Sequence, residues 1–382
     1  MALESKRVAI VGAGASGCIA AYFLLNAGCD VTIFDYSTPL RTLLPTGGGR
    51  CNLAHAEYDF KELAKNYPRG EKFLYSVFSK FSTYDTISLF EGLGIKTYTQ
   101  EDNRIFPISN SAKQVRETIL GKIKNAQFLK EYVSSLTLVN NEFKLKTEKA
   151  EYLFTDVIIA TGGAKTTKQI DNLQHNIIEN KPSLVGLNAN IKELSGIVIK
   201  NVFSKELVMY GDILFTHFGI SGPLTYKISA IKAYDKYPYN LVFDLYPEGF
   251  DLQGILNSNP HKDIKNVLSE FLPKKFVLYL LNVLQIQENQ KASMIDGKTR
   301  DRILDRVHNF EIKIMGVNKG EETVTAGGID LTQINSKTME SKIIPHLYFI
   351  GEVLDIDGFC GGFNLQNAWS TAFVASDAII NS

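Results

Sequence analysis

Three glycines near the start of the chain lie between a short β-branched run and an apolar helical pattern. Gly12, Gly14 and Gly17 have the G-x-G-x-x-G spacing, Ala15 is a further candidate cofactor-binding residue, and the predicted helix runs from Ser16 to Asn26. The first glycine of such a turn permits a tight bend, the second leaves room for a ligand, and the third lets helix and strand pack closely. The unpaired N–H groups of the helix start favour phosphate, so we predict a pyrophosphate site here.

An acidic residue follows the next predicted strand. That strand covers residues 30–34 and ends at Asp35, about 20 residues beyond the glycines, where a carboxylate can accept hydrogen bonds from a ribose. The alternative is a glycine-rich turn that binds nothing. Strand, turn, helix, strand and acid all occur in order, which favours the dinucleotide interpretation.

A second glycine-rich segment, T-G-G-G-R-C-N, occupies residues 46–52. Its successive glycines, among them Gly48 and Gly49, expose backbone N–H groups, and Arg50 adds a fixed cation. We predict that this segment folds over a cofactor and that Arg50 is a candidate catalytic residue. Alone, the segment would be a flexible turn.

The remaining cofactor-like patterns lie in the middle and at the end of the chain. Residues 156–163 form a buried strand ending in glycines, and residues 344–350 form another that runs into Gly351 and Glu352. Gly361 and Gly362 precede a helix predicted from about residue 364 to residue 379, whose positive end could face developing negative charge. An ordinary helix start is the alternative.

One histidine stands out in the middle of the chain. His217 lies in T-H-F-G-I-S-G-P, residues 216–223, which we interpret as a loop. A packed or solvent-facing histidine is the simpler interpretation, and catalysis by His217 is the alternative.

Composition limits the partners and the compartment. The 382 residues carry 41 Lys plus Arg and 41 Asp plus Glu, so no charge surplus favours a polyanion, and we expect no nucleic acid partner. The 4 cysteines are far apart and form no C-x-x-C pair, which argues against a metal site or a dithiol relay. No export signal and no run of 18 apolar residues occurs, so we expect a cytoplasmic protein without membrane segments.

The elements that must position these residues suggest two domains. Both chain ends carry cofactor patterns, so residues 1–181 and 322–382 are predicted to form one α/β domain of the Rossmann-like type. Within it, residues 132–139, 142–147 and 151–154 are predicted as an antiparallel meander. Residues 182–321 carry no second glycine motif and are predicted to be an inserted β-rich and helical domain.

Four segments together indicate a family: G-A-G-A-S-G, T-G-G-G-R-C-N, I-A-T-G-G, and G-E-V-L-D-I-D-G-F-C-G-G-F-N-L-Q. They resemble bacterial FAD-dependent oxidoreductases described as aminoacetone-oxidase-like or 3-dehydro-bile-acid-reductase-like. The resemblance extends over nearly the whole chain. It implies a Rossmann-like FAD domain of the two-dinucleotide-binding type with an inserted domain that is β-barrel-like and helical.

The resemblance also implies the residues that bind FAD. They are Gly12, Gly14, Ser16 and Gly17 at the pyrophosphate, Asp35 at the ribose, Val133, Thr161 and Gly162 near the adenine, Glu352 near the ribityl chain, and Gly362, Phe363 and Asn364 at the flavin ring. Asn364 is also a candidate catalytic residue. The family usually has Glu then Lys where this chain has Asp35 and Tyr36, and Lys in place of Thr42.

We therefore expect an FAD-dependent oxidoreductase acting on a small organic substrate, with NAD(P)H as a possible electron donor at the flavin face. A flavoprotein that modifies RNA and a non-catalytic redox sensor are the alternatives. The substrate, the choice between NADH and NADPH, and the oligomeric state stay open at this point.

Overall fold

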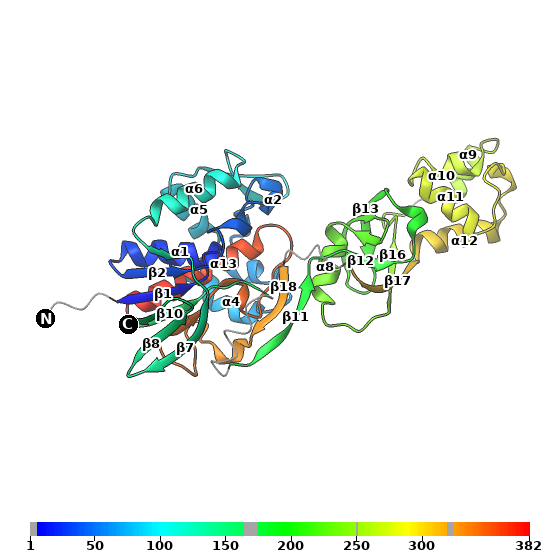
Figure 1. Cartoon of the computed structure of the whole chain (residues 1–382). Coiled ribbons are helices and arrows are strands. Elements are labelled where there is room, and N and C mark those ends of the chain that lie inside the picture. The colour runs from blue at the N-terminus through cyan, green and yellow to red at the C-terminus, as the bar shows by residue number, and fades with distance from the viewer. Residues whose placement is uncertain (1–5, 164–174, 250, 319–323) are drawn as a thin grey trace. The chain divides into compact units, whose positions relative to one another are not determined.

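The computed structural model describes residues 6–163, 175–249, 251–318 and 324–382. The chain divides into two compact units, one formed by residues 1–181 and 324–382 and the other by residues 182–323. Figure 1 shows the path of the chain, with the blue N-terminal and red C-terminal segments together in the first unit. Each unit is described by itself below.

A parallel sheet forms the centre of the first unit. Its strand order is β19-β10-β1-β2-β6, with every neighbouring pair parallel. The strands are β1 (Arg7–Val11), β2 (Asp30–Phe34), β6 (Gln127–Leu129), β10 (Asp156–Ile159) and β19 (Leu347–Phe349). In β1 and β2 only the first residue is exposed, as expected for strands covered on both faces. The Rossmann-like fold class is confirmed.

Helices from both chain ends pack beside this sheet. Ser376 of α13 (Phe363–Ile380) donates a hydrogen bond to the carbonyl of Ala20 in α1 (Ala15–Asn26), 3.3 Å away. Three short helices also belong to this unit, α3 (Phe60–Ala64), α4 (Glu71–Phe78) and α5 (Thr83–Gly92). Helix α6 (Ala112–Lys122) begins after Ser111, whose hydroxyl caps Gln114 N as its sequence position predicts.

Two smaller antiparallel sheets complete this unit. The predicted meander consists of β7 (Val133–Val139), β8 (Glu142–Thr147) and β9 (Glu151–Phe154). The second sheet has the order β3-β5-β4, with β3 (Ala54–His55), β4 (Thr97–Thr99) and β5 (Arg104–Pro107). Strands β11 (Ile177–Ser183) and β18 (Val324–Ile329) pair where the chain passes between the units.

The second unit contains a closed barrel of strand order β12-β15-β14-β13-β16-β17, which confirms the barrel-like prediction. Its strands are β12 (Leu187–Ala189), β13 (Val198–Ser204), β14 (Met209–Phe215), β15 (Gly219–Ser221), β16 (Tyr239–Asp244) and β17 (Phe310–Val317). The prediction of a loop over residues 216–223 was wrong for part of that segment, because β15 pairs with β12 and β14 there. Its Gly219 is needed because a Cβ would lie 2.2 Å from Leu187 O.

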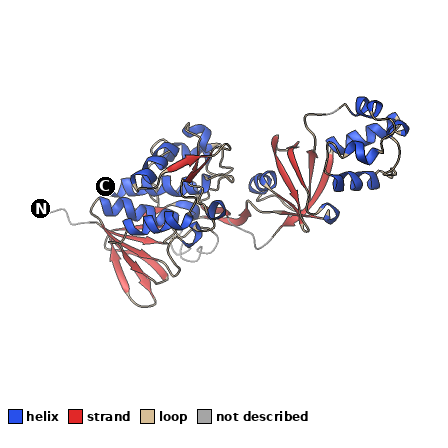
Figure 2. Cartoon of the chain, turned by 90° about the horizontal axis from the view of Figure 1, so that it is seen from above, coloured by secondary structure: helices blue, strands red, loops and turns tan. Residues whose placement is uncertain are grey.

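Helices lie on two sides of the barrel, as Figure 2 shows. They are α8 (Pro223–Ile231), α9 (Leu252–Ser258), α10 (Ile264–Leu268), α11 (Lys274–Val283) and α12 (Gly297–His308). Residues 263–285 form two helices and not one, because Pro273 lacks the N–H that a continuous helix requires. Helix α8 has Pro223 in its first turn.

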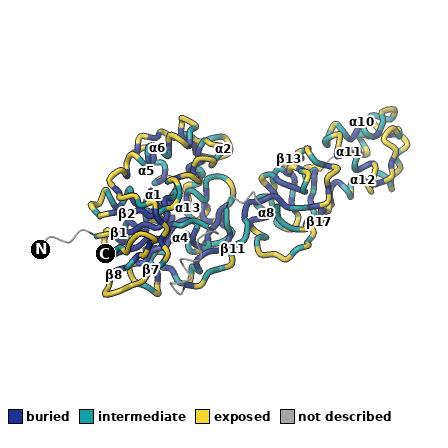
Figure 3. The backbone as a smooth tube through the Cα atoms, in the orientation of Figure 1, coloured by how far each residue is buried: buried dark blue, intermediate teal, exposed yellow. Residues whose placement is uncertain are grey.

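Each unit has its own buried core. One cluster includes β1, β2 and β10 with α1 and α13, and the other lines the barrel and its helices. In Figure 3 the strands of the central sheet are mostly dark blue, whereas the meander carries exposed segments. Across the described ranges of the chain, every helix is too short or too polar to cross a membrane.

Candidate functional site

The glycine turn joins β1 to α1 at the carboxyl edge of the sheet. Gly12 has φ +111°, and a Cβ there would lie 2.3 Å from Ala160 O, while a Cβ at Gly17 would lie 2.0 Å from Gly12 O. These two glycines are therefore required by the protein's own backbone. At Gly14, in contrast, a Cβ would meet nothing within 4 Å. The open position stands at the N-terminus of α1, where Gly14 is the N-cap and provides no side chain to cap the helix.

Asp35 links the end of β2 to this turn. Its carboxylate accepts hydrogen bonds from Ala13 N at 2.7 Å and from the N–H and hydroxyl of Ser37 at 2.7 and 2.8 Å. Three donors thus fix the orientation of a carboxylate that lies directly beside the glycine turn.

The end of β10 lies against the same turn, because Ala160 is the residue that Gly12 approaches. The next residue, Thr161, has a buried hydroxyl oxygen for which no partner is present in the described parts of the chain. Gly162 has φ +77° and open space where a Cβ would stand. Val133, the first residue of β7, is buried with 3% of its surface exposed.

The triple-glycine segment is a short helical turn, α2 (Thr46–Gly49), with left-handed backbone at Gly47 and Gly48. A Cβ at Gly47 would lie 2.8 Å from the Phe106 ring, whereas Gly48 faces open space. At Gly49, φ is +83° and the nearest atom to a Cβ is Leu44 O, 4.0 Å away. The conformation therefore needs glycine at each of the three positions, but only Gly47 is packed tightly.

Arg50 is held in place by its own loop and by an aromatic ring. Its guanidinium carbon lies 4.2 Å from the centre of the Phe106 ring, and its Nε donates to Gly47 O at 3.2 Å. Its terminal nitrogens donate no hydrogen bond to any residue within the described ranges. Arg50 is thus a positioned cation with donors to spare.

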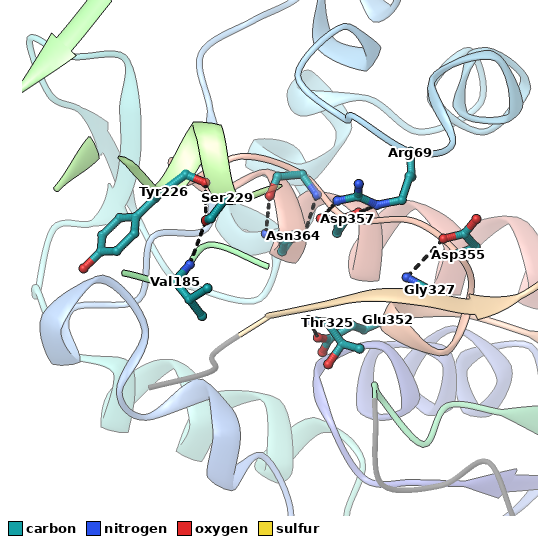
Figure 4. A network of polar contacts seen from close by, with 11 residues as sticks. Arg69, Val185, Tyr226, Ser229, Thr325, Gly327, Glu352, Asp355, Asp357 and Asn364 are labelled. Carbon is teal, nitrogen blue, oxygen red and sulfur yellow. Dashed lines mark hydrogen bonds and ion pairs between the residues drawn. The ribbon is translucent and has the colours of Figure 1, made fainter. Parts of the chain in front are cut away.

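The C-terminal segment brings carboxylates next to the sheet edge (Figure 4). A Cβ on Gly351 would lie 2.6 Å from Ser16 Oγ, so the two chain ends meet here. Glu352 accepts a hydrogen bond from Thr325 N at 2.8 Å. Burial raises the pKa of Glu352, and the negative charge of Asp357 raises it further.

The two following carboxylates have separate partners. Asp355 accepts from Gly327 N at 3.1 Å, and burial is the main cause that raises its pKa. Asp357 is fully buried, and its two carboxylate oxygens accept hydrogen bonds from Nε and Nη2 of Arg69. A bidentate pair of this kind fixes the loop that leads to α13.

Asn364 closes that loop. Its side-chain oxygen accepts from Gly358 N and its amide nitrogen donates to Gly358 O, both at 2.8 Å. Gly362, the N-cap of α13, has φ +99°, and a Cβ there would lie 2.5 Å from the carbonyl carbon and oxygen of Ala54. The backbone at Gly362 therefore packs closely against the backbone of β3.

Two residues beside Phe363, His55 and Tyr67, were not predicted as site residues from the sequence. His55 stacks on the Phe363 ring, with 4.6 Å between ring centres, and its Nδ1 lies 3.2 Å from Gly361 O. Burial lowers the pKa of His55. The hydroxyl of Tyr67 donates to Phe363 O at 2.6 Å. The position of His55 three residues after the T-G-G-G-R-C-N segment was the one available signal.

His217 lies apart from these residues in the chain. It belongs to the barrel unit, where it is exposed between β14 and β15 and contacts Phe218 edge-on at 5.3 Å between ring centres. Every other residue predicted for the site lies in the first unit.

These features fit a dinucleotide. Three predicted glycines, Gly14, Gly48 and Gly162, have open space where a side chain would stand. Of the eight buried side-chain oxygens without a partner among the described residues, three are those of Thr161, of Asn52 in the triple-glycine segment and of Asn367 in α13. A buried polar atom without a partner is costly, and a bound polar group would remove that cost.

The parallel sheet, the glycine turn at its carboxyl edge and the acid after β2 define a Rossmann-type dinucleotide-binding protein. The chain belongs to the family of the HI0933-like protein Rossmann domain, whose profile matches residues 6–378. It is a flavin-dependent oxidoreductase, and FAD is its cofactor.

Three curated relatives match almost end to end. A ribosomal RNA dihydrouridine synthase of Haemophilus influenzae is 30% identical over 401 residues, covering 97% of each chain. The protein of that name from Escherichia coli is 28% identical, with 99% of each chain covered. A 3-dehydro-bile acid delta(4,6)-reductase of Clostridium scindens is 26% identical, with 98% of each covered.

Two solved flavoenzymes share the fold. A 3-ketosteroid delta1-dehydrogenase from Sterolibacterium denitrificans has a TM-score of 0.53 at 13% identity, covering 99% of this chain and 100% of its own. A flavocytochrome c3 fumarate reductase has a TM-score of 0.51 at 15% identity, covering 99% of this chain and 78% of its own.

Proposed function

We propose that this oxidoreductase reduces a carbon–carbon double bond conjugated to a carbonyl, with NAD(P)H as the source of electrons. The observation that carries the proposal is that relatives with different substrates share one reaction type. Dihydrouridine is uridine with its 5,6 double bond saturated, and a delta(4,6)-reductase acting on a 3-dehydro bile acid also saturates ring double bonds. Both kinds of bond are conjugated to a carbonyl.

The net reaction adds hydride to the carbon β to the carbonyl and a proton to the carbon α to it. The double bond becomes a single bond while NAD(P)H is oxidised to NAD(P)⁺. FAD supplies two-electron hydride chemistry when it is bound. Support for its location comes from Gly14, Gly48 and Gly162, which leave space, and from Asp35, whose carboxylate is held at the end of β2.

We assign to Arg50 the role of stabilising the negative charge that develops on the substrate oxygen during this reaction. Its guanidinium is already oriented by Phe106 and Gly47 O, so little side-chain freedom is lost when it binds an oxygen. A positioned donor of this kind stabilises an oxyanion better than a mobile one does. Asn364 has both polar atoms on Gly358, which supports a role in positioning the loop before α13.

The second candidate substrate is uridine in ribosomal RNA. It is favoured by the two dihydrouridine synthases, which are 28% and 30% identical to this chain over nearly their whole length. Against it stands the equal number of basic and acidic residues, 41 of each, since RNA binding normally draws on a basic surface.

The experiment that tests the proposal offers both substrates to the same enzyme. The FAD-loaded protein is incubated without oxygen with NADH or NADPH and either a 4-en-3-one steroid or ribosomal RNA from cells lacking this gene. Mass spectrometry then measures saturated steroid or dihydrouridine. Saturation of either substrate supports the reaction class and identifies the substrate, whereas oxidation of NAD(P)H without saturation of either contradicts it.

A further inference from the structure

A half-buried histidine at the end of β3 has its ring held in one orientation. His55 stacks on the Phe363 ring, with 4.6 Å between ring centres and 29° between the planes. Its Nδ1 lies 3.2 Å from Gly361 O. A carbonyl oxygen only accepts hydrogen bonds, so this contact places a proton on Nδ1.

The other ring nitrogen of His55, Nε2, is open to a ligand. It makes no hydrogen bond within the described ranges, and it is not one of the eight buried polar side-chain atoms there that lack a partner, so solvent reaches it. When the ring is charged, Nε2 carries a second proton. His55 can release that proton while Nδ1 keeps its hydrogen bond to Gly361 O.

His55 shares a sheet face with the cation assigned to the developing charge. It is opposite Arg104 in the antiparallel pair of β3 and β5, and opposite residues point to the same face. Phe106, two residues beyond Arg104, points to this face as well and packs on the Arg50 guanidinium, 4.2 Å from its ring centre. Diagonal neighbours such as His55 and Phe106 are about 7–8 Å apart, within reach of long side chains. One small substrate can therefore contact both Arg50 and His55.

The hydroxyl beside Phe363 is occupied. Tyr67 is 1% exposed, donates its proton to Phe363 O at 2.6 Å, and has a pKa raised well above its usual value by burial. Arg50 keeps its protons at physiological pH. His55, in contrast, has a side chain that ordinarily titrates in the physiological range.

The surroundings of His55 act on its pKa in both directions. Burial is the main cause that lowers the pKa, and the hydrogen bond to Gly361 O raises it. The carboxylates of Asp102 and Glu57 raise it as well, and the Arg104 guanidinium lowers it. The first turn of α13, against which the ring packs, carries no charged side chain.

We infer that His55 is the proton donor of the reduction and delivers its Nε2 proton to the carbon α to the carbonyl. The inference rests on the proposed function. A hydride that originates from NAD(P)H adds to the β carbon, and the electron pair of the double bond moves toward the α carbon and the oxygen bound by Arg50. The Nε2–H bond then breaks as the new C–H bond forms at the α carbon. His55 is left neutral and regains its proton from water.

The test measures proton donation apart from hydride transfer. FAD-loaded wild type and His55→Gln, whose amide does not act as an acid, are assayed from pH 5 to pH 9 with NAD(P)H and whichever candidate substrate the wild type saturates. For His55→Gln we expect kcat to fall about 100- to 10 000-fold, the range for general acid catalysis. The rate at which NAD(P)H is oxidised in a single turnover before substrate is added should stay unchanged.

Two further readouts distinguish a proton donor from a residue that only packs. The wild-type kcat/KM should fall as the pH rises through the pKa of His55, since the neutral ring has no Nε2 proton, and His55→Gln should lack this fall. NMR titration of the substrate-free holoprotein, with the His55 signal assigned as the one missing from the variant, should give the same pKa. Two different pKa values would overturn the inference.

His261→Gln is the matched control, at an exposed histidine of the second unit, and should leave kcat and its pH profile unchanged. If His55→Gln also leaves both unchanged, the inference is wrong while the proposed reaction stands. Loss of the pH dependence in Cys360→Ser instead would assign the proton to the Cys360 thiol and would equally overturn it. A wild type that saturates neither substrate contradicts the proposed function, and the inference falls with it.

Discussion

At the scale of single residues, the two arginines beside Phe106 have different surroundings. Arg50 lies 4.2 Å from the ring centre and has terminal nitrogens that bind no described residue, whereas Arg104 lies 5.7 Å away and is paired with Asp102 at 2.5 Å. The ring therefore carries one cation with donors to spare and one that is already neutralised. We therefore expect Arg50, and not Arg104, to stabilise the negative charge that develops during the reaction.

We expect Arg50→Lys to lower kcat by about 10- to 100-fold, because lysine keeps the charge but not the planar donors, and loss of one oxyanion donor costs up to about 10³. Steady-state kinetics would measure the change in kcat, with whichever of the two candidate substrates the enzyme is found to saturate. Arg104→Lys is the matched control and should leave kcat within about twofold. Equal effects of the two substitutions would show that Arg50 acts only by packing on Phe106.

Glu352 gives a pH dependence whose sign follows from its burial. Burial raises its pKa above the ordinary 4.5, so the folded state binds the proton more tightly than the unfolded state does. Its contribution to stability is fully present below pH 4.5 and is lost as the pH rises through the folded pKa. Glu352→Gln keeps an acceptor for Thr325 N without the charge.

We therefore expect Glu352→Gln to match the wild type near pH 4 and to become the more stable protein as the pH increases. Urea unfolding in constant excess FAD between pH 4 and pH 8 would measure the difference. Glu117→Gln, at an exposed position of α6, is the matched control for the Glu-to-Gln change. A difference for Glu352→Gln that stays constant across this pH range would mean that Glu352 is not desolvated in the folded protein.

At the scale of elements, the start of α13 depends on one glycine. A Cβ at Gly362 would overlap the Ala54 backbone at 2.5 Å, and φ is +99°. Gly362→Ala should therefore lower the free energy of unfolding by more than the roughly 1–3 kcal/mol that a strained backbone conformation costs. Thermal or urea unfolding would measure it, and FAD would be lost together with stability.

Gly121→Ala is the control because Gly121 lies in α6 with nothing within 4 Å of a Cβ. It should stabilise the protein by about 0.5–1 kcal/mol through helix propensity. A Gly362→Ala protein as stable as the wild type would show that β3 and α13 do not meet as the structure has them.

The elements also show what the sequence could reveal. The glycine turn, Asp35 and the β10 end were predictable because each follows a buried strand at a fixed distance. The contact of Gly362 with Ala54 could not be predicted, because it joins residues 308 positions apart by tertiary packing alone. β15 was missed because its three residues lie between Thr216 and Gly222 in a segment whose glycines and proline indicate a loop.

At the scale of the whole molecule, the two units have separate cores, and the residues predicted to bind the cofactor belong to the first unit. We propose that residues 182–323 fold as an inserted domain, so calorimetry should resolve two unfolding transitions. Excess FAD should raise the midpoint of one transition and leave the other unchanged, since a ligand stabilises only the unit that binds it. A single transition, or two that shift equally, would contradict this organisation.

Reoxidation of the prereduced holoprotein tests the account most directly. The FAD-loaded protein is photoreduced without oxygen, with EDTA as the electron donor, and mixed in a stopped-flow instrument with a 4-en-3-one steroid, the corresponding saturated ketone, or ribosomal RNA from cells lacking this gene. The recovery of flavin absorbance is then followed. The account predicts that the conjugated steroid or the RNA reoxidises the flavin at least 100-fold faster than the saturated ketone does, a barrier difference of about 2.7 kcal/mol. Reoxidation by neither conjugated substrate faster than by the saturated ketone would contradict it.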